Sequence, residues 1–404
     1  MAKKAMKIKR YRSVSGAGKK HGSAAVRLLV LLLLAGVIFA IGWFGASHCI
    51  DAITEFWYTH ISVSRPAQDA EQEQPADDSA ATGETESVPE VQPEPPAETE
   101  PVTDDAGTWG EVALSALNTE DALRTALSVL SQSGADHAVL TLKDDRGYVY
   151  YDSGVEMAAE AVRAQADIAL FVRLCEEYGL APCARLEVFC DPLTAYARRD
   201  AAVHFEREGV LWLDTSAELG GKPWLNPYSA DARGYAAALA QELAAAGMTD
   251  ILFSGVQFPS GYALEFCYYG ESAAQLSRTD CLRECVAMLH SAAEQAGANA
   301  WFIWPADAAL FGADVSMVYG DGPAALGAQR ILLETKPVRN ADGILQLPEA
   351  DAAALNTFAA AAGEKGTQRF ALDLSALAAD PAMENSWLQA AQAAGFTHFW
   401  KTLP

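Results

Sequence analysis

Residues 183–192 read CARLEVFCDP, the pattern of a buried β-strand that ends in a polar loop. Side chains alternate along a strand, so Arg185 and Glu187 share one face while Leu186 and Val188 share the other. The apolar face predicts packing against helices. The charged face then points into a barrel, where its charges must be paired. The pattern fits a structural ion pair and equally a carboxylate of a functional site with its Arg partner.

Similar apolar strands recur from Trp109 to the end of the chain and alternate with Ala-rich helical patterns. This alternation is typical of a parallel sheet with helices on both faces. Residues 109–404 are long enough for one closed barrel, so we predict a (β/α)8 TIM-type barrel. Nine strand candidates exceed the eight of a barrel, and VLWLD at 210–214 is expected to be a hairpin arm.

The expected strands are His137–Leu142, Cys183–Phe189, Leu211–Leu213 or Trp224, Asp250–Val256, Ala300–Trp304, Asp314–Tyr319, Ile331–Thr335, Phe370–Leu374 and Thr397–Trp400. The expected helices are Thr119–Gln132, Met157–Tyr178, Asp231–Ala246, Ser277–Ala296, Ala350–Ala362 and Asn385–Ala394.

A membrane anchor is predicted near the amino terminus. Residues 28–46 read LLVLLLLAGVIFAIGWFGA and hold no charge, so a helix there would cross most of a hydrocarbon core of about 30 Å. Residues 1–27 hold nine Lys and Arg and no acid, which favours a cytoplasmic tail and an exported chain. We predict a single-pass cell-membrane protein with a transmembrane signal anchor at 28–47 and a juxtamembrane segment at 48–65. A cleaved signal peptide is the alternative.

A disordered linker is predicted at residues 66–108. The stretch is rich in Glu, Pro, Ala and Thr and has almost no large apolar residue, so it cannot bury enough surface to fold. Its prolines and like charges keep it extended. The whole chain has a net charge of −24, which argues against a nucleic-acid partner because phosphate binding needs a cationic face.

Carboxylates follow several predicted strands, where the active sites of such barrels lie. Asp144 leaves the first expected strand within a run of charges, and Glu187 and Asp191 belong to the second. Large aromatic residues occur near the same ends. Aromatic faces stack on sugar rings, and paired acids act on the glycosidic bond. Other residues of these two kinds are Glu334, Asp373, Asp321, Trp224, Tyr228 and Tyr319.

Motifs of other enzyme classes are missing from the sequence. It has no G-x-S-x-G elbow, no Walker A loop and no H-E-x-x-H pair. The seven His are scattered, and the seven Cys are sparse and odd in number, so neither a metal site nor a disulfide framework is indicated. Cys281 and Cys285 lie one helical turn apart and are expected to be buried thiols. No cofactor is expected.

A series of short blocks resembles the putative glycosyl hydrolase domain family, a TIM-barrel relative of the glycoside hydrolases. The blocks keep the family's order from about residue 137 to 319. They are VLTLKDD at 139–145, ARLEVF at 184–189 with Asp191 and Pro192, GVLW at 209–212, WLNPY at 224–228, ILFSGVQFP at 251–259 and MVY at 317–319. The resemblance implies a barrel with a carbohydrate cleft.

One block departs from the family's pattern. Where the family has F-D-Y-x-R-F-P, this chain has Ser254, Gly255 and Gln257 in place of the Asp, Tyr and Arg. The resemblance makes that Asp the best candidate for a catalytic carboxylate, and a serine cannot take over its role. Glu187 stands where the family tends to be apolar. It either replaces the lost acid from a neighbouring strand or pairs with Arg185.

We therefore predict a membrane-anchored, extracytoplasmic, glycoside-hydrolase-like protein that acts on or binds a cell-envelope polysaccharide. The predicted catalytic residues are Glu187, Asp144 and Asp191. The predicted substrate-binding residues are Arg185, Lys143, Trp224, Asn226, Tyr228, Tyr319, Asp373 and Glu334.

Two other functions stay open. The first is a catalytically degenerate barrel that serves as a carbohydrate-binding or envelope scaffold module, which the loss of the acid at Ser254 favours. The second is a hydrolase or deacetylase that holds a metal at residues 143–145, which the absence of a His pair disfavours.

Overall fold

The computed structural model describes residues 107–207, 209–310, 315–339, 345–346, 349–362 and 369–401. The predicted tail, signal anchor and juxtamembrane segment lie outside these residues, and so does the predicted linker up to residue 106. Within the described ranges, no helix has both the length and the apolar character that crossing a bilayer requires.

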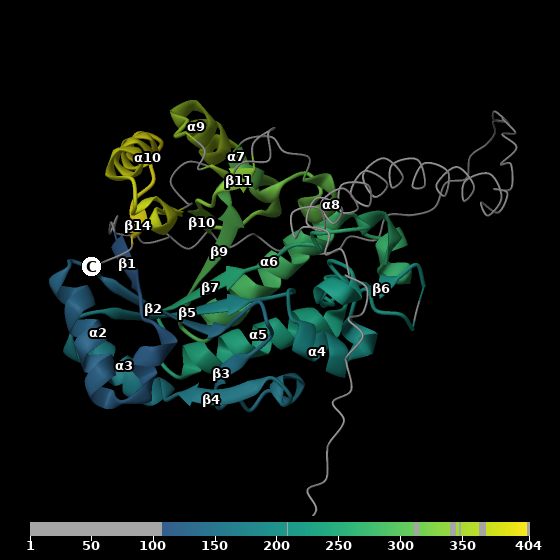
Figure 1. Ribbon diagram of the computed structural model, residues 1–404, viewed down its shortest axis with the longest axis horizontal. Coiled ribbons are helices and arrows are strands. Elements are labelled where there is room, and N and C mark those ends of the chain that lie inside the picture. The colour runs from purple at the N-terminus through teal and green to yellow at the C-terminus, as the bar shows by residue number, and fades with distance from the viewer. Residues whose placement is uncertain are drawn as a thin grey trace, which may run out of the picture. The chain divides into compact units, whose positions relative to one another are not determined.

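Eight parallel strands close into a barrel with helices around its outside (Figure 1). Pairing runs in the order β1, β2, β5, β7, β9, β10, β13 and β14, and β1 pairs with both β2 and β14. The predicted (β/α)8 arrangement is confirmed for this domain. The barrel strands are β1 Gly107–Glu111, β2 His137–Lys143, β5 Ala181–Glu187, β7 Asp250–Ser254, β9 Asn299–Pro305, β10 Arg330–Glu334, β13 Arg369–Asp373 and β14 His398–Trp400.

Further short strands extend the barrel sheet or form small separate ribbons. β3 Val149–Tyr151 pairs antiparallel with β2, and β4 Val162–Ala166 pairs with β3. β6 His204–Phe205 and β8 Cys267–Tyr268 form a separate antiparallel ribbon, which joins the loop after β5 to the loop after β7. A second small ribbon follows β10 and consists of β11 Val338–Arg339 and β12 Leu345–Gln346.

The longer helices begin at residues whose side chains cap the first turn. At α2, α5 and α6 the caps are Thr119, Ser229 and Ser277, and each hydroxyl oxygen accepts a backbone N–H from the first turn. The α-helices are α2 Glu120–Gln132, α3 Ile168–Glu177, α4 Pro192–Ala197, α5 Ala230–Ala245, α6 Arg278–Gln295, α7 Ala306–Leu310, α8 Ser316–Tyr319, α9 Ala352–Ala361 and α10 Pro381–Ala393. The 3-10 helices are η1 Leu114–Asn118, η2 Glu156–Ala158, η3 Arg199–Ala201, η4 Ala217–Leu219, η5 Leu264–Phe266, η6 Glu271–Ala274, η7 Pro323–Leu326 and η8 Ser375–Leu377.

The eighth barrel strand comes from a segment that the sequence pattern does not mark. β1 begins at Gly107, inside the predicted linker, and its sequence GTWGE has no apolar run. Its neighbours β14 and β2 pair with it from both sides. Tertiary pairing therefore makes a strand of residues whose own composition does not favour one.

Two predicted elements are wrong, and one lies outside the ring as expected. The strand predicted at Asp314–Tyr319 is the short helix α8, where the Val318 carbonyl accepts an N–H from Phe258 in the loop after β7. The helix predicted at Met157–Tyr178 is interrupted by β4, because pairing with β3 overrides a weak Ala-rich helix preference. The predicted hairpin arm at 210–214 forms an isolated bridge to His204 through Leu211.

Alternate strand residues fill the interior of the barrel. Cys183 belongs to this interior, and Arg185 and Glu187 continue its face toward the carboxyl end of β5, as the alternation predicts. A larger apolar cluster lies between the strands and the surrounding helices. The apolar interior residues are Trp109, Val139, Cys183, Leu252, Trp301, Ile303, Leu332, Ala371 and Trp400.

A polar layer closes the barrel at the amino ends of its strands. Asp250 accepts hydrogen bonds from Trp301 Nε1 at 3.0 Å and Asn299 Nδ2 at 3.1 Å. The ring centroids of His137 and His398 lie 6.4 Å apart. Burial lowers the pKa of His398 to about 4, and it lowers the pKa of His137 as well. These imidazoles are therefore neutral in the folded protein at neutral pH.

Replacing His398 by Gln should reduce the acid sensitivity of the fold. The folded state resists protonation of His398 until about pH 4, whereas the unfolded chain takes up this proton near pH 6.5. As the pH falls through that window, the wild type loses about 3 kcal/mol of unfolding free energy that the variant does not lose. Urea unfolding of both proteins at neutral pH and near pH 4.5 measures the difference. An identical loss in both proteins would contradict this assignment.

Candidate active site

The carboxyl ends of the barrel strands surround a cavity of about 160 Å³. β5 contributes Arg185 and Glu187, β7 contributes Ser254, and β10 contributes Glu334. Trp224 reaches the cavity from the loop between β5 and α5. Active sites of TIM barrels occupy this end of the strands. The other lining residues are Asp145, Cys190, Gly255, Gln257, Ile303, Pro305 and Lys336.

Glu187 ends β5 directly beside Ser254, its register partner on β7. The Ser254 hydroxyl donates a hydrogen bond of 2.6 Å to Glu187 Oε2. Gly255 leaves room for the other oxygen, because a Cβ there would lie 1.6 Å from Glu187 Oε1. Burial raises the pKa of Glu187, and the Ser254 hydrogen bond and the charges of Lys143 and Arg185 only partly oppose this effect. Glu187 therefore keeps its proton to a higher pH than an exposed glutamate does.

Glu334 lies in the same cavity in a contrasting environment. Arg185 Nη2 lies 3.2 Å from its Oε1, and Lys336 Nζ lies 2.5 Å from its Oε2. Burial alone would raise the pKa of Glu334, but these two cations hold it below its usual value. The cavity thus brings together one carboxyl group whose pKa is raised and one whose pKa is lowered.

Asp373 is the register partner of Glu334 on the next strand, β13. It is 4% exposed and accepts a hydrogen bond of 2.8 Å from the backbone N–H of Ser375. Burial raises the pKa of Asp373 to about 6. Among the described residues, Glu334 lines the cavity and Asp373 does not. Asp373 therefore lies beside the site and does not form part of the cavity wall.

A sequence family accounts for much of this domain. Residues 112–309 match the family model described as "Putative glycosyl hydrolase domain". Over these residues, just under half of the chain, the protein is similar to that family. The matched segment includes Glu187 and Ser254 and ends before β10, so Glu334 and Asp373 lie outside it.

Two solved structures resemble the glycosyl hydrolase domain in fold. One is the PgaB (BpsB) glycoside hydrolase domain from Bordetella bronchiseptica, with 14% identity and a TM-score of 0.51 over 74% of this chain and 94% of that one. The other is the catalytic domain of β-amylase from Paenibacillus polymyxa, with 12% identity and a TM-score of 0.50 over 74% of this chain and 92% of that one. These likenesses show a shared fold. Among curated proteins, none matches this chain in sequence.

Two predicted site residues of the glycosyl hydrolase domain are buried outside the cavity. Lys143 is 2% exposed and Asp191 is fully buried, and their Nζ and Oδ2 atoms lie 2.9 Å apart. Lys143 also donates a hydrogen bond of 2.6 Å to the Glu187 backbone carbonyl. Asp191 caps α4 by accepting the Thr194 N–H. The structure therefore places this pair behind Glu187 as support, not as the catalytic and substrate-binding groups that the sequence predicted.

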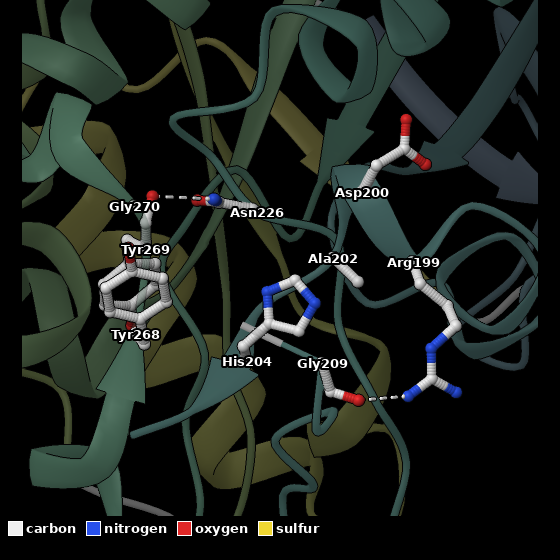
Figure 2. A pocket seen from close by; sticks show the side chains of 9 residues that line it. All are labelled: Arg199, Asp200, Ala202, His204, Gly209, Asn226, Tyr268, Tyr269 and Gly270. Carbon is white, nitrogen blue, oxygen red and sulfur yellow. Dashed lines mark hydrogen bonds between the residues drawn. The ribbon is translucent and has the colours of Figure 1, made fainter. Parts of the chain in front are cut away.

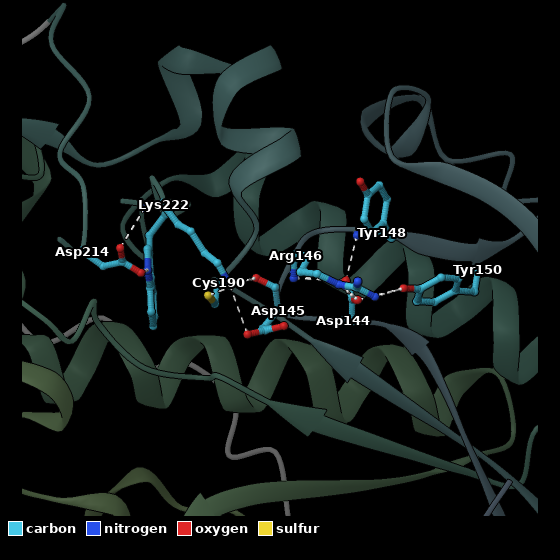
Figure 3. Close-up of polar contacts among 9 residues, drawn as sticks. Asp144, Asp145, Arg146, Tyr148, Tyr150, Cys190, Asp214 and Lys222 are labelled. Carbon is cyan, nitrogen blue, oxygen red and sulfur yellow. Dashed lines mark hydrogen bonds and ion pairs between the residues drawn. The ribbon is translucent and has the colours of Figure 1, made fainter. Parts of the chain in front are cut away.

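Asp144 and Asp145 point to different surroundings (Figure 3). Asp144 accepts hydrogen bonds from the Arg146 side chain and the Tyr150 hydroxyl, so it holds the turn between β2 and β3 and does not line the cavity. Asp145 lines the cavity, and its carboxylate lies 3.3 Å from Lys222 Nζ. Asp144, a predicted catalytic residue, is therefore not among the cavity-lining residues, whereas the adjacent Asp145 is. The prediction used only the position of Asp144 after the expected strand, which does not tell which residue of the charged run faces the cavity.

Of the remaining predicted substrate-binding residues, one lines the cavity and the others hold residues or loops near it. Trp224 lines the cavity. The Tyr319 hydroxyl donates a hydrogen bond of 2.6 Å to Oε1 of Gln257. Gln257 lines the cavity and Tyr319 does not, so Tyr319 supports a lining residue. Asn226 and Tyr228 hold neighbouring loops through the carbonyls of Tyr269 and Leu276.

Cavity residues that were not among the predicted catalytic or substrate-binding residues include Asp145, Cys190, Gln257 and Lys336. All four lie in loops, where strand alternation gives no orientation. No group of three or more His, Cys, Asp or Glu that could hold a metal occurs in the part of the chain that the structure describes. The described residues therefore provide no ligand cluster for the metal-dependent alternative at 143–145.

Replacing Gly255 by Ala should disturb Glu187 beyond the ordinary cost of a left-handed backbone. Gly255 has φ +67°, and Gly134 has φ +81° with nothing near its Cβ position, so Gly134→Ala is a matched control. We expect about 1–2 kcal/mol of destabilisation in the control. Gly255→Ala should lose about 1–3 kcal/mol more, because Glu187 must leave the Ser254 hydroxyl. Urea unfolding measures both. Equal losses would mean that Glu187 moves aside freely.

Proposed function

We propose that the glycosyl hydrolase domain hydrolyses a polysaccharide, with Glu187 as the general acid and Glu334 as the ionised carboxylate. The observation that carries the proposal is that both line one cavity at the carboxyl ends of the barrel strands. Glycoside hydrolysis needs a carboxylic acid and a carboxylate across the scissile bond. Two carboxyl groups whose environments push their pKa values apart supply these roles.

In this mechanism Glu187 gives its proton to the glycosidic oxygen as the bond to the anomeric carbon breaks. The Ser254 hydroxyl holds the Glu187 carboxyl in place and can donate to the carboxylate that is left. The negative charge of Glu334 stabilises the oxocarbenium-like transition state. Water adds its oxygen to the anomeric carbon, and its proton restores the acid. Arg185 and Lys336 keep Glu334 ionised before the reaction begins.

Trp224 supplies an aromatic wall of the cavity. It is 6% exposed, and its Nε1 lies 3.5 Å from Asp214 Oδ2, which orients the ring. An aromatic ring face complements the apolar face of a pyranose. The cavity is smaller than the usual 300–1,000 Å³ of small-molecule sites, so we propose that it holds the reacting unit of a longer chain.

We further propose that the substrate is a cell-envelope polysaccharide. The apolar span at 28–47, behind a basic tail, would hold the chain in the cell membrane with the barrel outside. The acidic linker at 66–106 would let the barrel reach glycans at a distance from the bilayer. Protease treatment of intact cells tests the orientation, because it should remove the barrel and leave the tail protected.

The proposed hydrolysis is tested with the full chain in detergent micelles and purified cell-envelope glycans. New reducing ends should appear in proportion to enzyme and time. The second candidate is a carbohydrate-binding module without activity, which the serine at position 254 favours. Binding of the same glycans without any new reducing ends would support that candidate and reject hydrolysis.

A further inference from the structure

A second hollow lies among the loops that follow β5 and β7, and we call it the side groove (Figure 2). It has a volume of about 350 Å³, and its lining includes Arg199, His204, Gly209, Asn226 and Tyr268. These residues come from the loops after β5 and β7, at the same end of the barrel as the cavity. The side groove falls within the usual size range of small-molecule sites.

The ribbon of β6 and β8 builds one wall of the side groove. His204 and Tyr268 are opposite each other in this antiparallel pair, so both side chains leave the same face. Figure 2 shows His204 between Tyr268 on one side and Arg199 with Gly209 on the other. Arg199 is held by a hydrogen bond of 2.8 Å to the Gly209 carbonyl. An aromatic ring thus lies close to several polar groups that can exchange hydrogen bonds with hydroxyls.

One short segment connects the side groove with the cavity. Trp224 lines the cavity and Asn226 lines the side groove, two residues further along the chain. Leu225 between them is buried and forms a bridge with Ala202, which also lines the side groove. The segment 224–226 therefore contributes a lining residue to each hollow.

We propose that the side groove binds a second, uncharged sugar unit of the chain whose reacting unit occupies the cavity. This inference rests on the proposed function and adds the substrate class, a neutral polymer bound at two places. The ring of Tyr268 would stack on the sugar, and His204, Asn226 and Arg199 would meet its hydroxyls.

Charge selects a neutral polymer over an anionic one. Residues 107–404 hold 38 Asp and Glu against 19 Lys and Arg, so the domain repels polyanions. Within the side groove, Asp200 accompanies Arg199, and a further cation, Arg198, lies 3.6 Å from the Asp200 carboxylate. The groove is therefore polar but close to neutral, which suits hydroxyl and amide groups better than carboxylates.

The test compares chain lengths with the full chain in micelles, carrying Glu187→Gln so that no probe is consumed. Calorimetry measures binding of cellohexaose, maltohexaose and chitohexaose, their disaccharides, and hexagalacturonate as the anionic probe. At least one neutral hexasaccharide should bind more tightly than its disaccharide. Tyr268→Ala, and separately Arg199→Gln, should weaken binding of that hexasaccharide about tenfold. Neither variant should change the affinity for the disaccharide. Tyr262→Ala is the matched control, since Tyr262 is 74% exposed in the same loop and does not line the groove.

The outcomes separate this inference from the proposed function. Length-dependent binding that needs Tyr268, without turnover by the wild type, would keep the side groove as a sugar site and reject hydrolysis. If turnover is lost in Glu187→Gln but unchanged in Tyr268→Ala and Arg199→Gln, the side groove is not a sugar site, and the proposed hydrolysis still stands. Equal weakening of long and short probes, preference for hexagalacturonate, or no binding of any saccharide would each overturn the inference.

Discussion

Replacing Lys143 by Met should lower the unfolding free energy of the barrel by about 3–5 kcal/mol. Lys143 is 2% exposed and lies 2.9 Å from Asp191, which is fully buried. Without its partner, the Asp191 carboxylate would remain in a dry interior with an uncompensated charge. The variant also leaves the Glu187 backbone carbonyl without its Lys143 donor. Chemical denaturation at neutral pH, with the slope of the transition compared between variants, measures the loss.

The double variant Lys143→Met with Asp191→Leu is the matched control. It removes both charges and should recover the part of the loss that comes from the unpaired carboxylate. It still lacks the cap of α4, worth about 1 kcal/mol, and still leaves the Glu187 carbonyl without its Lys143 donor. Asp191→Leu alone should be severely destabilised, because it leaves the Lys143 cation unpaired. A loss below about 1 kcal/mol in Lys143→Met would mean that water reaches the pair in solution.

Glu187→Gln should reduce turnover of the envelope glycan by about 10²–10⁴-fold while the fold is kept. Gln fills the same space and still accepts a hydrogen bond from the Ser254 hydroxyl, but it has no proton to give to the glycosidic oxygen. Because the pKa of Glu187 is raised by burial, a neutral side chain there should not destabilise the domain. Initial rates of reducing-end release and a urea unfolding curve measure the two effects.

The pH profile gives an independent check on the role of Glu187. The reaction needs its protonated form, so the wild-type rate should fall as the pH rises through its raised pKa. The residual activity of Glu187→Gln should lack this decline. Glu160→Gln makes the same chemical change at an exposed position and should leave rate and profile unaltered. A wild-type rate in Glu187→Gln would remove Glu187 from the chemistry.

The alternation of side chains along a single strand could be predicted well. Residues 183–189 show it clearly, and Arg185 and Glu187 do point into the barrel. Asp144 could not be placed in this way, because it was assigned only from its position after a strand. Its orientation is set in the turn after β2 by hydrogen bonds from Arg146 and the Tyr150 hydroxyl, and these contacts are not visible in the sequence pattern.

The contacts between site residues could not be predicted from the sequence either. Glu187 could be assigned to a strand end, but its contact with Ser254 depends on the register of β5 with β7. Glu334 meets Arg185 across the inside of the barrel, 149 positions away in the chain. The strand β1 escaped notice because its residues become a strand only when both neighbours are present.

The two ends of the domain leave the barrel on opposite faces. Gly107 begins β1 beside His137 and His398, whereas β14 ends at Trp400, whose ring lies against Arg185 at the cavity end. A fusion partner or bead attached through the amino end therefore leaves the entrance free for a large polymer. The same handle placed after the carboxyl end would crowd the entrance. For any immobilised or displayed form of this domain, the amino end is the side from which to hold it.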